Sequence, residues 1–459
     1  MTNFHLPLPF ALPLALSIGG AFAFVTQDGA PPPPATQEVV APAATLAEAI
    51  ERFAAAAKDA SANKDRTFRA RAAELFDGLV ANIDVTRFTL ADLDTLRAAG
   101  VPFEATVAGR RLDDALAARV SDAGQAGLDA GLMRLRLMPQ GMAWSEEPAD
   151  IEARSARVLA ALKHAHLPKA LAEGRATAVF GSVALLGADG LRAEHARVVR
   201  LLGMVPDTIA DASLRDVYGY FTAAPEHLAA EQFAAQEAQR ARFSALIAAR
   251  ANVAGLDDKQ KQSFTRMQRA LDGDYCKRPL VGGPAPALEF TFAHHAKEEG
   301  FKVASLEELR GNVVVIDFWA TWCGPCIASF PNVRELVSHY EGYDVVVLGV
   351  TSLQGAHYGA AGKIDTTGDP AKEYELMKEF VLEKEMTWPV AFSTSDVFDP
   401  NYGVNGIPHV VIIDPAGNIR ERGLHPAGDA DKEHATIDAL LAEFGLDAPP
   451  SKASEAQGG

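Results

Sequence analysis

The chain has 459 residues, of which 48% are hydrophobic and three are cysteine. It is therefore long enough for two or three domains with ordinary cores and needs no disulfide framework. The formal net charge of −17 opposes nucleic-acid binding and offers no polybasic patch to a membrane surface.

The first 25 residues are predicted to be a signal peptide or a membrane anchor. Residues 4–25 contain no charged side chain and include the small-residue pattern Ala-Phe-Ala at 21–23, which is typical of export signals. The lack of an early Lys or Arg and the three prolines in this run depart from that pattern. An uncleaved anchor is the alternative, since about 20 apolar residues span a bilayer. Either interpretation predicts the cell envelope or periplasm, and a cytosolic chain is the third possibility.

Residues 26–42 are predicted to be an extended linker, because they include four consecutive prolines. The next region, residues 43–274, is rich in Ala, Leu, Arg and Glu and repeats the periodicity of amphipathic helices, which predicts an all-α domain. Thr45 and Glu48 have the spacing of a capping box at its start. No motif in this region indicates chemistry, so we expect it to position or recognise a partner.

Histidines in the helical region do not indicate a metal site. His164 and His166 are two positions apart and would point in different directions on a helix. Metal-binding pairs on helices are four positions apart. Solvated or packing roles are therefore favoured.

A second domain is predicted for residues 281–445, after a boundary rich in Pro and Gly. Apolar runs predict strands that alternate with helical patterns, which indicates an α/β sheet. The predicted strands are 288–292, 312–318, 344–351, 390–392 and 410–414, with a final strand after a turn at 415–418, and the predicted helices are 327–340, 371–385 and 432–444. Residues 446–459 are predicted to be a disordered tail.

The most informative motif is Trp-Cys-Gly-Pro-Cys at 322–326, between a predicted strand and a predicted helix. Unpaired N–H groups and the dipole at the helix start favour the thiolate of Cys323 and lower its pKa from the usual value of about 8.5. Cys326 lies one turn deeper, where it can attack a mixed disulfide on Cys323. The spacing thus predicts a redox disulfide between these two cysteines and leaves Cys276 unpaired.

A zinc site is the competing interpretation of the same spacing, because half of many zinc sites is a Cys-x-x-Cys pair. Cys276 and the pair His294–His295 could be imagined as further ligands, but the chain has no second Cys-x-x-Cys. Haem attachment would require histidine where Ile327 stands. We therefore predict no metal and no cofactor.

The second domain resembles the TlpA-like thiol:disulfide oxidoreductases, which have the thioredoxin fold. The features that carry the resemblance, besides the two-cysteine motif, are Asp317-Phe318-Trp319-Ala320, Pro331, Gly406-Ile407-Pro408 and Ile413-Asp414-Pro415-Ala416-Gly417. It covers about residues 281–444 and leaves the helical region outside. The implied fold class is an all-α N-terminal region followed by an α/β thioredoxin fold.

The resemblance also implies a catalytic role for an acid. Asp317 matches the acidic residue that lies buried beneath the disulfide of thioredoxin. Burial raises a carboxyl pKa, and Asp317 could then take the proton from Cys326 as that cysteine attacks.

The same resemblance implies a substrate-binding surface. Pro408 is expected to be a cis-proline beside the sulfurs, with Ile407 offering backbone groups to an extended substrate strand. Trp322 is expected to cover the thiols and contact partners. Gly324 and Pro325 complete this predicted surface.

Two positions depart from the family pattern. Ser329 stands where the active-site helix commonly has an acid, and His409 replaces a small or hydroxylated residue after the cis-proline. His409 could tune the thiolate, but an ordinary polar residue at a strand start is the favoured interpretation.

The sequence thus predicts a thiol-disulfide oxidoreductase that reduces disulfides of envelope proteins. The Gly-Pro dipeptide matches the reducing thioredoxins, with potentials of about −270 mV, and a reductant in an oxidising compartment implies a membrane electron donor. A peroxidase is one alternative, although none of the three cysteines has the Pro-x-x-x-Thr-x-x-Cys context. The other alternative is a partner-binding helical protein whose redoxin domain is regulatory.

Overall fold

The structure is a computed structural model that describes residues 41–450 except 66 and 299. The predicted leader, most of the predicted linker and the end of the predicted tail lie outside the described residues. The described chain divides into two compact units, residues 41–228 and 229–450, and each is described by itself. No helix of the described residues is long and apolar enough to cross a membrane.

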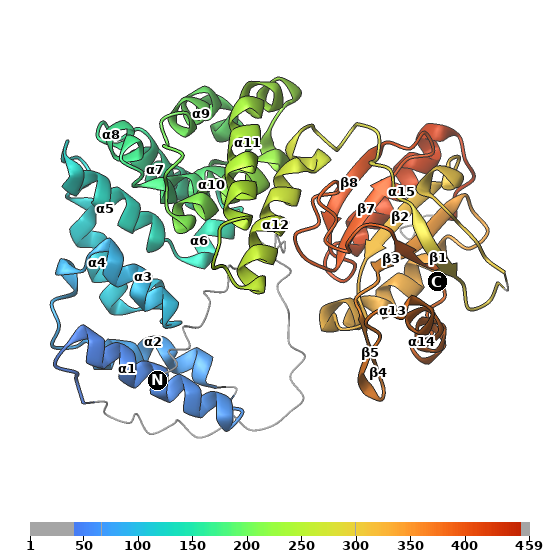
Figure 1. Ribbon diagram of the computed structural model, residues 1–459, viewed down its shortest axis with the longest axis horizontal. Coiled ribbons are helices and arrows are strands. Elements are labelled where there is room, and N and C mark those ends of the chain that lie inside the picture. The colour runs from blue at the N-terminus through green and yellow to red at the C-terminus, as the bar shows by residue number, and fades with distance from the viewer. Residues whose placement is uncertain (1–40, 66, 299, 451–459) are drawn as a thin grey trace. The chain divides into compact units, whose positions relative to one another are not determined.

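The first unit is helical, as the sequence predicted (Figure 1). Its α-helices are α1 (Leu46–Ala62), α2 (Phe68–Leu79), α3 (Leu90–Ala98), α4 (Val107–Ala117), α5 (Gln125–Arg136), α6 (Gln140–Trp144), α7 (Pro148–Leu162), α8 (Leu167–Ala172), α9 (Gly187–Leu202) and α10 (Asp211–Ala223), and the short 3-10 helices between them include η3 (Thr177–Leu186).

Local interactions explain how the first helix of this unit begins and packs. The Thr45 side chain accepts a hydrogen bond from Glu48 N at 3.2 Å, and Glu48 Oε2 accepts one from Ala44 N at 2.8 Å. The sequence-predicted cap is therefore present, with the glutamate bonding one residue earlier than in a standard capping box. Phe53 of α1 is buried and meets Phe76 of α2 edge to face at 5.8 Å between ring centroids, which joins the two helices.

The second unit combines a helical hairpin with a mixed six-stranded sheet. The hairpin is α11 (Ala230–Ala251) and α12 (Asp258–Asp272). The sheet order is β1-β6-β3-β2-β7-β8, with β6, β3 and β2 parallel and the other pairings antiparallel. The strands are β1 (Phe290–His294), β2 (Val313–Phe318), β3 (Val345–Ser352), β6 (Val390–Ser393), β7 (His409–Ile413) and β8 (Ile419–Leu424).

Helices pack on this sheet and a small hairpin extends from it. The helices are α13 (Gly324–His339), α14 (Pro370–Glu383) and α15 (Ala430–Phe444), and the hairpin is β4 (Ala356–Gly359) with β5 (Gly362–Asp365). In Figure 1 the β4–β5 hairpin projects from the body of this unit. β2 is buried along its whole length, as expected for a central strand whose two faces are both covered.

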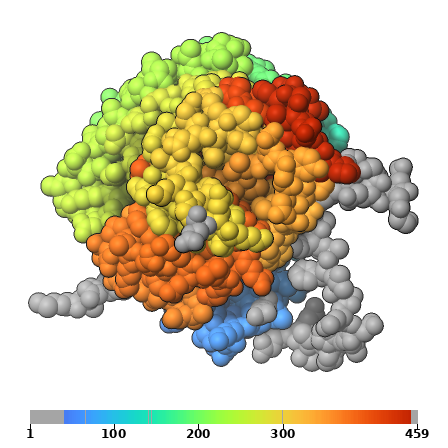
Figure 2. Space-filling model, turned by 90° about the vertical axis from the view of Figure 1, so that its right-hand side faces the viewer, coloured from blue at the N-terminus to red at the C-terminus, as the bar shows by residue number. Residues whose placement is uncertain are grey.

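The β1 edge of the sheet is partly closed by the chain itself. Phe290 N donates to Ala304 O at 2.9 Å, so the segment after β1 folds back along its start. In Figure 2 yellow residues occupy the middle of the face towards the viewer, with orange residues of later elements below them and to their right. This cover reduces the backbone that an edge strand would otherwise leave unpaired.

The hairpin α11–α12 is tied to the sheet through the short segment that follows it. Asp274 N donates to Asn401 Oδ1 at 3.3 Å, and the Arg422 guanidinium of β8 lies 4.3 Å from the Tyr275 ring centroid. Tyr275 and Cys276 are both buried. Residues 229–274, which the sequence assigns to the helical domain, thus belong to the same compact unit as the sheet.

Candidate redox site

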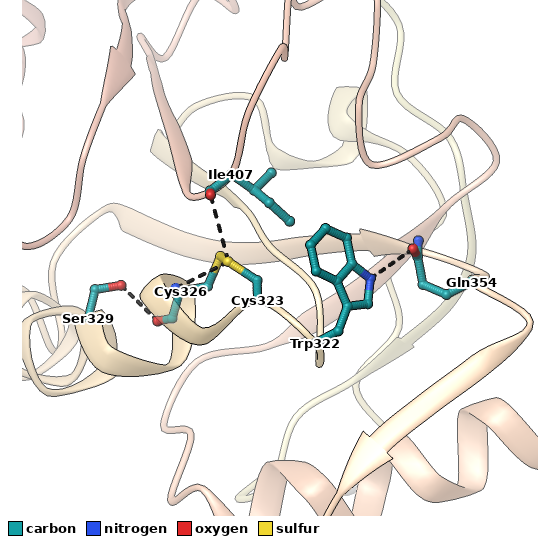
Figure 3. Close-up of a disulfide and its surroundings, with 6 residues drawn as sticks. All are labelled: Trp322, Cys323, Cys326, Ser329, Gln354 and Ile407. Carbon is teal, nitrogen blue, oxygen red and sulfur yellow. Dashed lines mark hydrogen bonds between the residues drawn. A yellow bond between two sulfur atoms is a disulfide. The ribbon is translucent and has the colours of Figure 1, made fainter. Parts of the chain in front are cut away.

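The two motif cysteines form a disulfide at the start of α13 (Figure 3). Cys323 is the N-cap residue of this helix, and its Sγ accepts a hydrogen bond from Cys326 N at 3.2 Å. Pro325 lies in the first turn, where its missing N–H costs no helical hydrogen bond. The backbone N–H of Cys326 and the positive end of the helix dipole therefore face the first sulfur, which favours its thiolate once the disulfide is reduced.

The two sulfurs differ in their access to solvent. Cys323 is 3% exposed and Cys326 is 0% exposed. Gly324 and Pro325, which lie between them, are exposed. Both cysteines are buried, and Cys323 retains the slightly larger exposure.

The segment before β7 lies next to the sulfur of Cys323. The Ile407–Pro408 peptide bond is cis, as the family resemblance implied. Cys323 Sγ lies 3.7 Å from the Ile407 carbonyl oxygen, which points at the sulfur in Figure 3. The disulfide sulfur carries no proton, so a hydrogen bond to this carbonyl forms only with the reduced thiol.

Trp322 forms an exposed aromatic surface beside the disulfide. Its side chain is 41% exposed, and its Nε1 donates to Gln354 Oε1 at 3.1 Å (Figure 3). Its ring lies 6.2 Å from the ring of Phe398, which is also exposed, as is Leu353. These three apolar side chains follow β2, β6 and β3, whose carboxyl ends meet at one edge of the sheet.

Sequence reasoning did not identify Leu353 and Phe398. Both lie in loops that carry no motif of their own. The signal that could have found them is their position in the loops that follow the predicted strands 344–351 and 390–392, because loops after parallel strands gather at the same sheet edge as the Trp-Cys-Gly-Pro-Cys motif.

Asp317 is buried in β2. The side chain is 1% exposed, and within the described residues neither carboxyl oxygen has a hydrogen-bond partner. Burial raises the pKa of Asp317 from 3.8 to about 8. A carboxyl with this pKa is a base comparable in strength to a thiolate.

A second buried acid, Glu433 on α15, was not predicted. Burial, together with the negative charges of Asp317 and Asp429, raises the pKa of its carboxyl from 4.5 to about 8. A sequence signal does exist, because Glu433 stands four and seven positions before Ile437 and Leu440. That spacing places it on the apolar face of the helix.

The positions that depart from the family pattern have packing roles. Ser329 Oγ donates to Cys326 O at 2.8 Å within α13 (Figure 3). His409 is buried, its ring meets Phe318 at 6.2 Å, and burial lowers its pKa well below 6.5. Val410, the next residue of β7, packs in the core with both cysteines, so His409 faces the other side of the sheet. His409 therefore lies on the sheet face opposite the two sulfurs, and it is buried instead of being an ordinary polar residue at a strand start.

The residues considered as zinc ligands have other surroundings. Cys276 is buried and its thiol pKa is raised to about 12, mainly by burial. His295 Nε2 lies 3.1 Å from Thr387 O. Within the described ranges, no three His, Cys, Asp or Glu side chains are grouped as a metal site.

The histidines of the first unit serve local hydrogen bonding. His164 Nε2 lies 2.9 Å from Asp122 O, and its Nδ1 accepts from His166 N at 3.2 Å. These contacts are those of a structural residue.

Comparison with known proteins finds similarity over part of the second unit. Residues 280–441 match the model of the Redoxin family. The chain is 28% identical over 141 residues to the thiol-disulfide oxidoreductase ResA of Oceanobacillus iheyensis, covering 31% of this chain and 63% of that protein. It is also 28% identical over 125 residues to the ResA of Bacillus cereus, covering 27% and 61%. The chain thus spans less than two thirds of the length of these relatives.

Solved structures match the same part of the chain. A thiol:disulfide interchange protein from Bacteroides sp. matches with 17% identity and a TM-score of 0.27, covering 34% of this chain and 90% of that one. A putative thiol:disulfide interchange protein DsbE from Chlorobium tepidum matches with 29% identity and a TM-score of 0.25, covering 35% and 96%. The Redoxin match and the sheet together confirm the predicted fold class.

Proposed function

We propose that this protein, whose C-terminal unit contains a TlpA-like redoxin domain with the thioredoxin fold, is a thiol-disulfide oxidoreductase that reduces protein disulfides. The observation that carries the proposal is the disulfide between Cys323 and Cys326 at the N-terminus of α13. The first sulfur also lies beside the Ile407 carbonyl and the cis Pro408. Oxidoreductase names among the relatives of this domain support the same activity.

The proposed reaction begins with the reduced protein. The Cys323 thiolate attacks one sulfur of a substrate disulfide, the substrate S–S bond breaks, and the departing substrate sulfur takes a proton from solvent. A mixed disulfide now joins Cys323 to the substrate. Cys326 then loses its proton and attacks Cys323 Sγ, which releases the second substrate sulfur to be protonated. The substrate gains two electrons and two protons, and the protein is left as the disulfide.

Asp317 is proposed to accept the proton of Cys326 in the second step. Its pKa of about 8 lies close to that of a free thiol, about 8.5. Proton transfer between groups of similar pKa needs little driving force in either direction. The same carboxyl can therefore return the proton when the disulfide is reduced again.

The substrate is proposed to be an extended polypeptide segment that carries the target cystine. Cys323 is almost covered, so the segment must lie across the surrounding surface to bring its sulfur into contact. Trp322, Leu353 and Phe398 offer apolar contacts on one side of the disulfide. Ile407 and Pro408 form the other side, with Gly324 and Pro325 exposed between the sulfurs.

The place of the reaction is proposed to be the cell envelope or periplasm. The apolar run at residues 4–25 supports export or anchoring. Reduction in an oxidising compartment consumes the dithiol, so a membrane electron donor is proposed to restore it.

Two cysteine variants test this function. Cys323→Ser should abolish reduction of a protein disulfide, measured by the turbidity of reduced insulin, because the attacking sulfur is lost. Cys326→Ser should accumulate mixed disulfides with its substrates, visible on non-reducing gels and removed by dithiothreitol. Cys276→Ser is the matched control and should keep full activity. Full activity of Cys323→Ser would refute the proposal.

A further inference from the structure

Asp317 and Glu433 approach each other from two elements on one side of the sheet. Val313, Val315 and Asp317 occupy alternate positions of β2 and so point to one face. Both valines pack in the core cluster that contains Cys326. Asp317 is therefore on the same face of the sheet as the resolving cysteine.

Helix α15 covers that face and brings Glu433 to it. Ile437 and Leu440 belong to the same core cluster as Cys326, and Glu433 lies on their side of the helix. The Glu433 side chain is 3% exposed, and its Oε1 has no hydrogen-bond partner within the described residues. Its charge interacts with that of Asp317.

The other charged groups around the pair do not neutralise it. Asp429, one turn before Glu433, is the second charge that acts on Glu433, and its Oδ2 accepts a hydrogen bond from His425 N at 2.8 Å. His434, the next residue of α15, contacts Glu335 of α13 at 3.1 Å. No Lys or Arg of the described residues contributes to the pKa of Asp317 or Glu433. Two buried carboxyls without a cation cannot both ionise at low cost.

We propose that Glu433 is a positioning residue that shares one proton with Asp317 and so keeps one carboxyl of the pair ready to accept the proton of Cys326. This inference rests on the proposed thiol-disulfide exchange and deepens it. Once the pair is singly protonated, the neutral carboxyl can turn to donate its proton to the ionised one, which stabilises the single negative charge. The first ionisation of the pair therefore occurs at lower pH than that of Asp317 alone.

The proton balance of the resolving step follows from this arrangement. Cys326 transfers its proton to the Asp317 carboxylate and attacks Cys323 Sγ, and the Cys323–substrate bond breaks as the Cys323–Cys326 bond forms. The pair then holds two protons. One of them leaves to solvent or returns to Cys326 when the protein is reduced.

The resolving step can be followed in the full-length reduced protein with 5,5′-dithiobis(2-nitrobenzoate). Attack by Cys323 releases one coloured thiolate in a first phase, and attack by Cys326 releases a second one in a later phase. In Glu433→Gln the first phase should keep its rate. The second phase should slow about tenfold at pH 7, and its pH midpoint should rise by about one unit, since one pKa unit is a tenfold change in ionisation.

Asp431→Asn is the matched control, because Asp431 is an exposed acid on the same helix. It should leave both phases unchanged. A second-phase midpoint in Glu433→Gln equal to that of the unmodified protein would overturn the inference. Equal slowing of both phases, with a lower Tm, would assign Glu433 a purely structural role and also overturn it.

A measurement that needs no activity separates this inference from the proposed function. Carbon-13 NMR of the side-chain carboxyls in the oxidised protein should show Asp317 and Glu433 each titrating in two coupled steps. Asp317 should titrate in one step in Glu433→Gln. An identical Asp317 curve in both proteins would refute the shared proton, even if the protein reduced disulfides. The coupled curves would support it even if no coloured thiolate were released.

Discussion

At the residue scale, the candidate redox site combines a disulfide with buried carboxyl groups. Cys323, Cys326 and Asp317 could be predicted from the sequence because they lie within ten residues of one another in one strand–helix segment. The sequence could not assign Glu433 to the same site, because more than a hundred residues separate it from Asp317. Packing of α15 on β2 brings the two acids together, and a local motif carries no information about that contact.

Asp317→Asn is expected to stabilise the protein at neutral and alkaline pH. The pKa of Asp317 rises from its ordinary value of 3.8 to about 8 in the folded protein, so the folded state binds the proton more tightly than the unfolded state. The stability that this tighter proton binding contributes is fully present below pH 3.8 and is lost as pH rises towards 8. The loss is about 1.4 kcal/mol per pH unit within that window.

Urea unfolding at pH 5 and pH 8 measures this effect. The free energy of unfolding of the unmodified protein should fall between the two pH values by more than that of Asp317→Asn. The difference between the two proteins should amount to a few kcal/mol at pH 8. Parallel pH profiles for both proteins would contradict a titrating Asp317. Asp431→Asn, which removes an exposed acid, should follow the unmodified protein.

At the element scale, long apolar strands were predicted well and short polar ones were not. The predicted strand 312–318 became β2, and the predicted helix 327–340 became α13, which begins three residues earlier at Gly324. The earlier start follows from Cys323 acting as the cap and Pro325 fitting the first turn. The hairpin β4–β5 was missed, because its strands are four residues long and mostly polar or Gly, which gives no periodic signal.

The β4–β5 hairpin is held in place by a buried acid of α14. Glu373 Oε1 accepts a hydrogen bond from Gln354 N at 2.8 Å, and its Oε2 accepts one from Thr366 Oγ1 at 2.6 Å. These partners lie on either side of the hairpin, and Gln354 also binds the Trp322 indole. The position of Trp322 thus depends on an element that the sequence did not predict.

Glu373→Ala should therefore impair substrate binding more than sulfur chemistry. Loss of two hydrogen bonds to a buried carboxylate should cost about 2 to 4 kcal/mol of stability. The KM for a protein disulfide should rise several-fold because Trp322 loses its support, while the rate of Cys323 with a small aromatic disulfide stays unchanged. Glu375→Ala on the same helix, whose exposed carboxylate pairs with Lys378, is the control. Equal loss of rate with both substrates would contradict this role.

At the scale of the whole molecule, the family match and the compact unit do not begin at the same residue. The Redoxin match begins at residue 280, whereas the compact unit that contains the sheet begins at residue 229. Sequence patterns suggested a boundary near residue 281, because Pro and Gly concentrate there. A segment rich in Pro and Gly indicates a break in regular structure. It does not show whether the helices before it, α11 and α12, pack with the first unit or with the sheet.

The hairpin α11–α12 is consequently expected to stabilise the redoxin domain. A fragment of residues 229–459 should unfold at a higher Tm than a fragment of residues 281–459. The shorter fragment lacks the buried Tyr275, its stacking with Arg422 and the hydrogen bond from Asp274 to Asn401. Burial of an aromatic side chain and one such cation–π contact together contribute about 2 to 4 kcal/mol, which corresponds to several degrees in Tm.

Thermal unfolding followed by circular dichroism, on both fragments in the oxidised state, measures this contribution. Tyr275→Ala in the longer fragment should lower its Tm part of the way towards that of the shorter one, which assigns the effect to this contact. Both fragments should form the Cys323–Cys326 disulfide, because the strand β2 and helix α13 that hold it lie after residue 281. Equal Tm values for the two fragments would mean that the hairpin packs on the sheet without stabilising it. The stable folding unit would then begin near residue 281, where composition suggests the boundary.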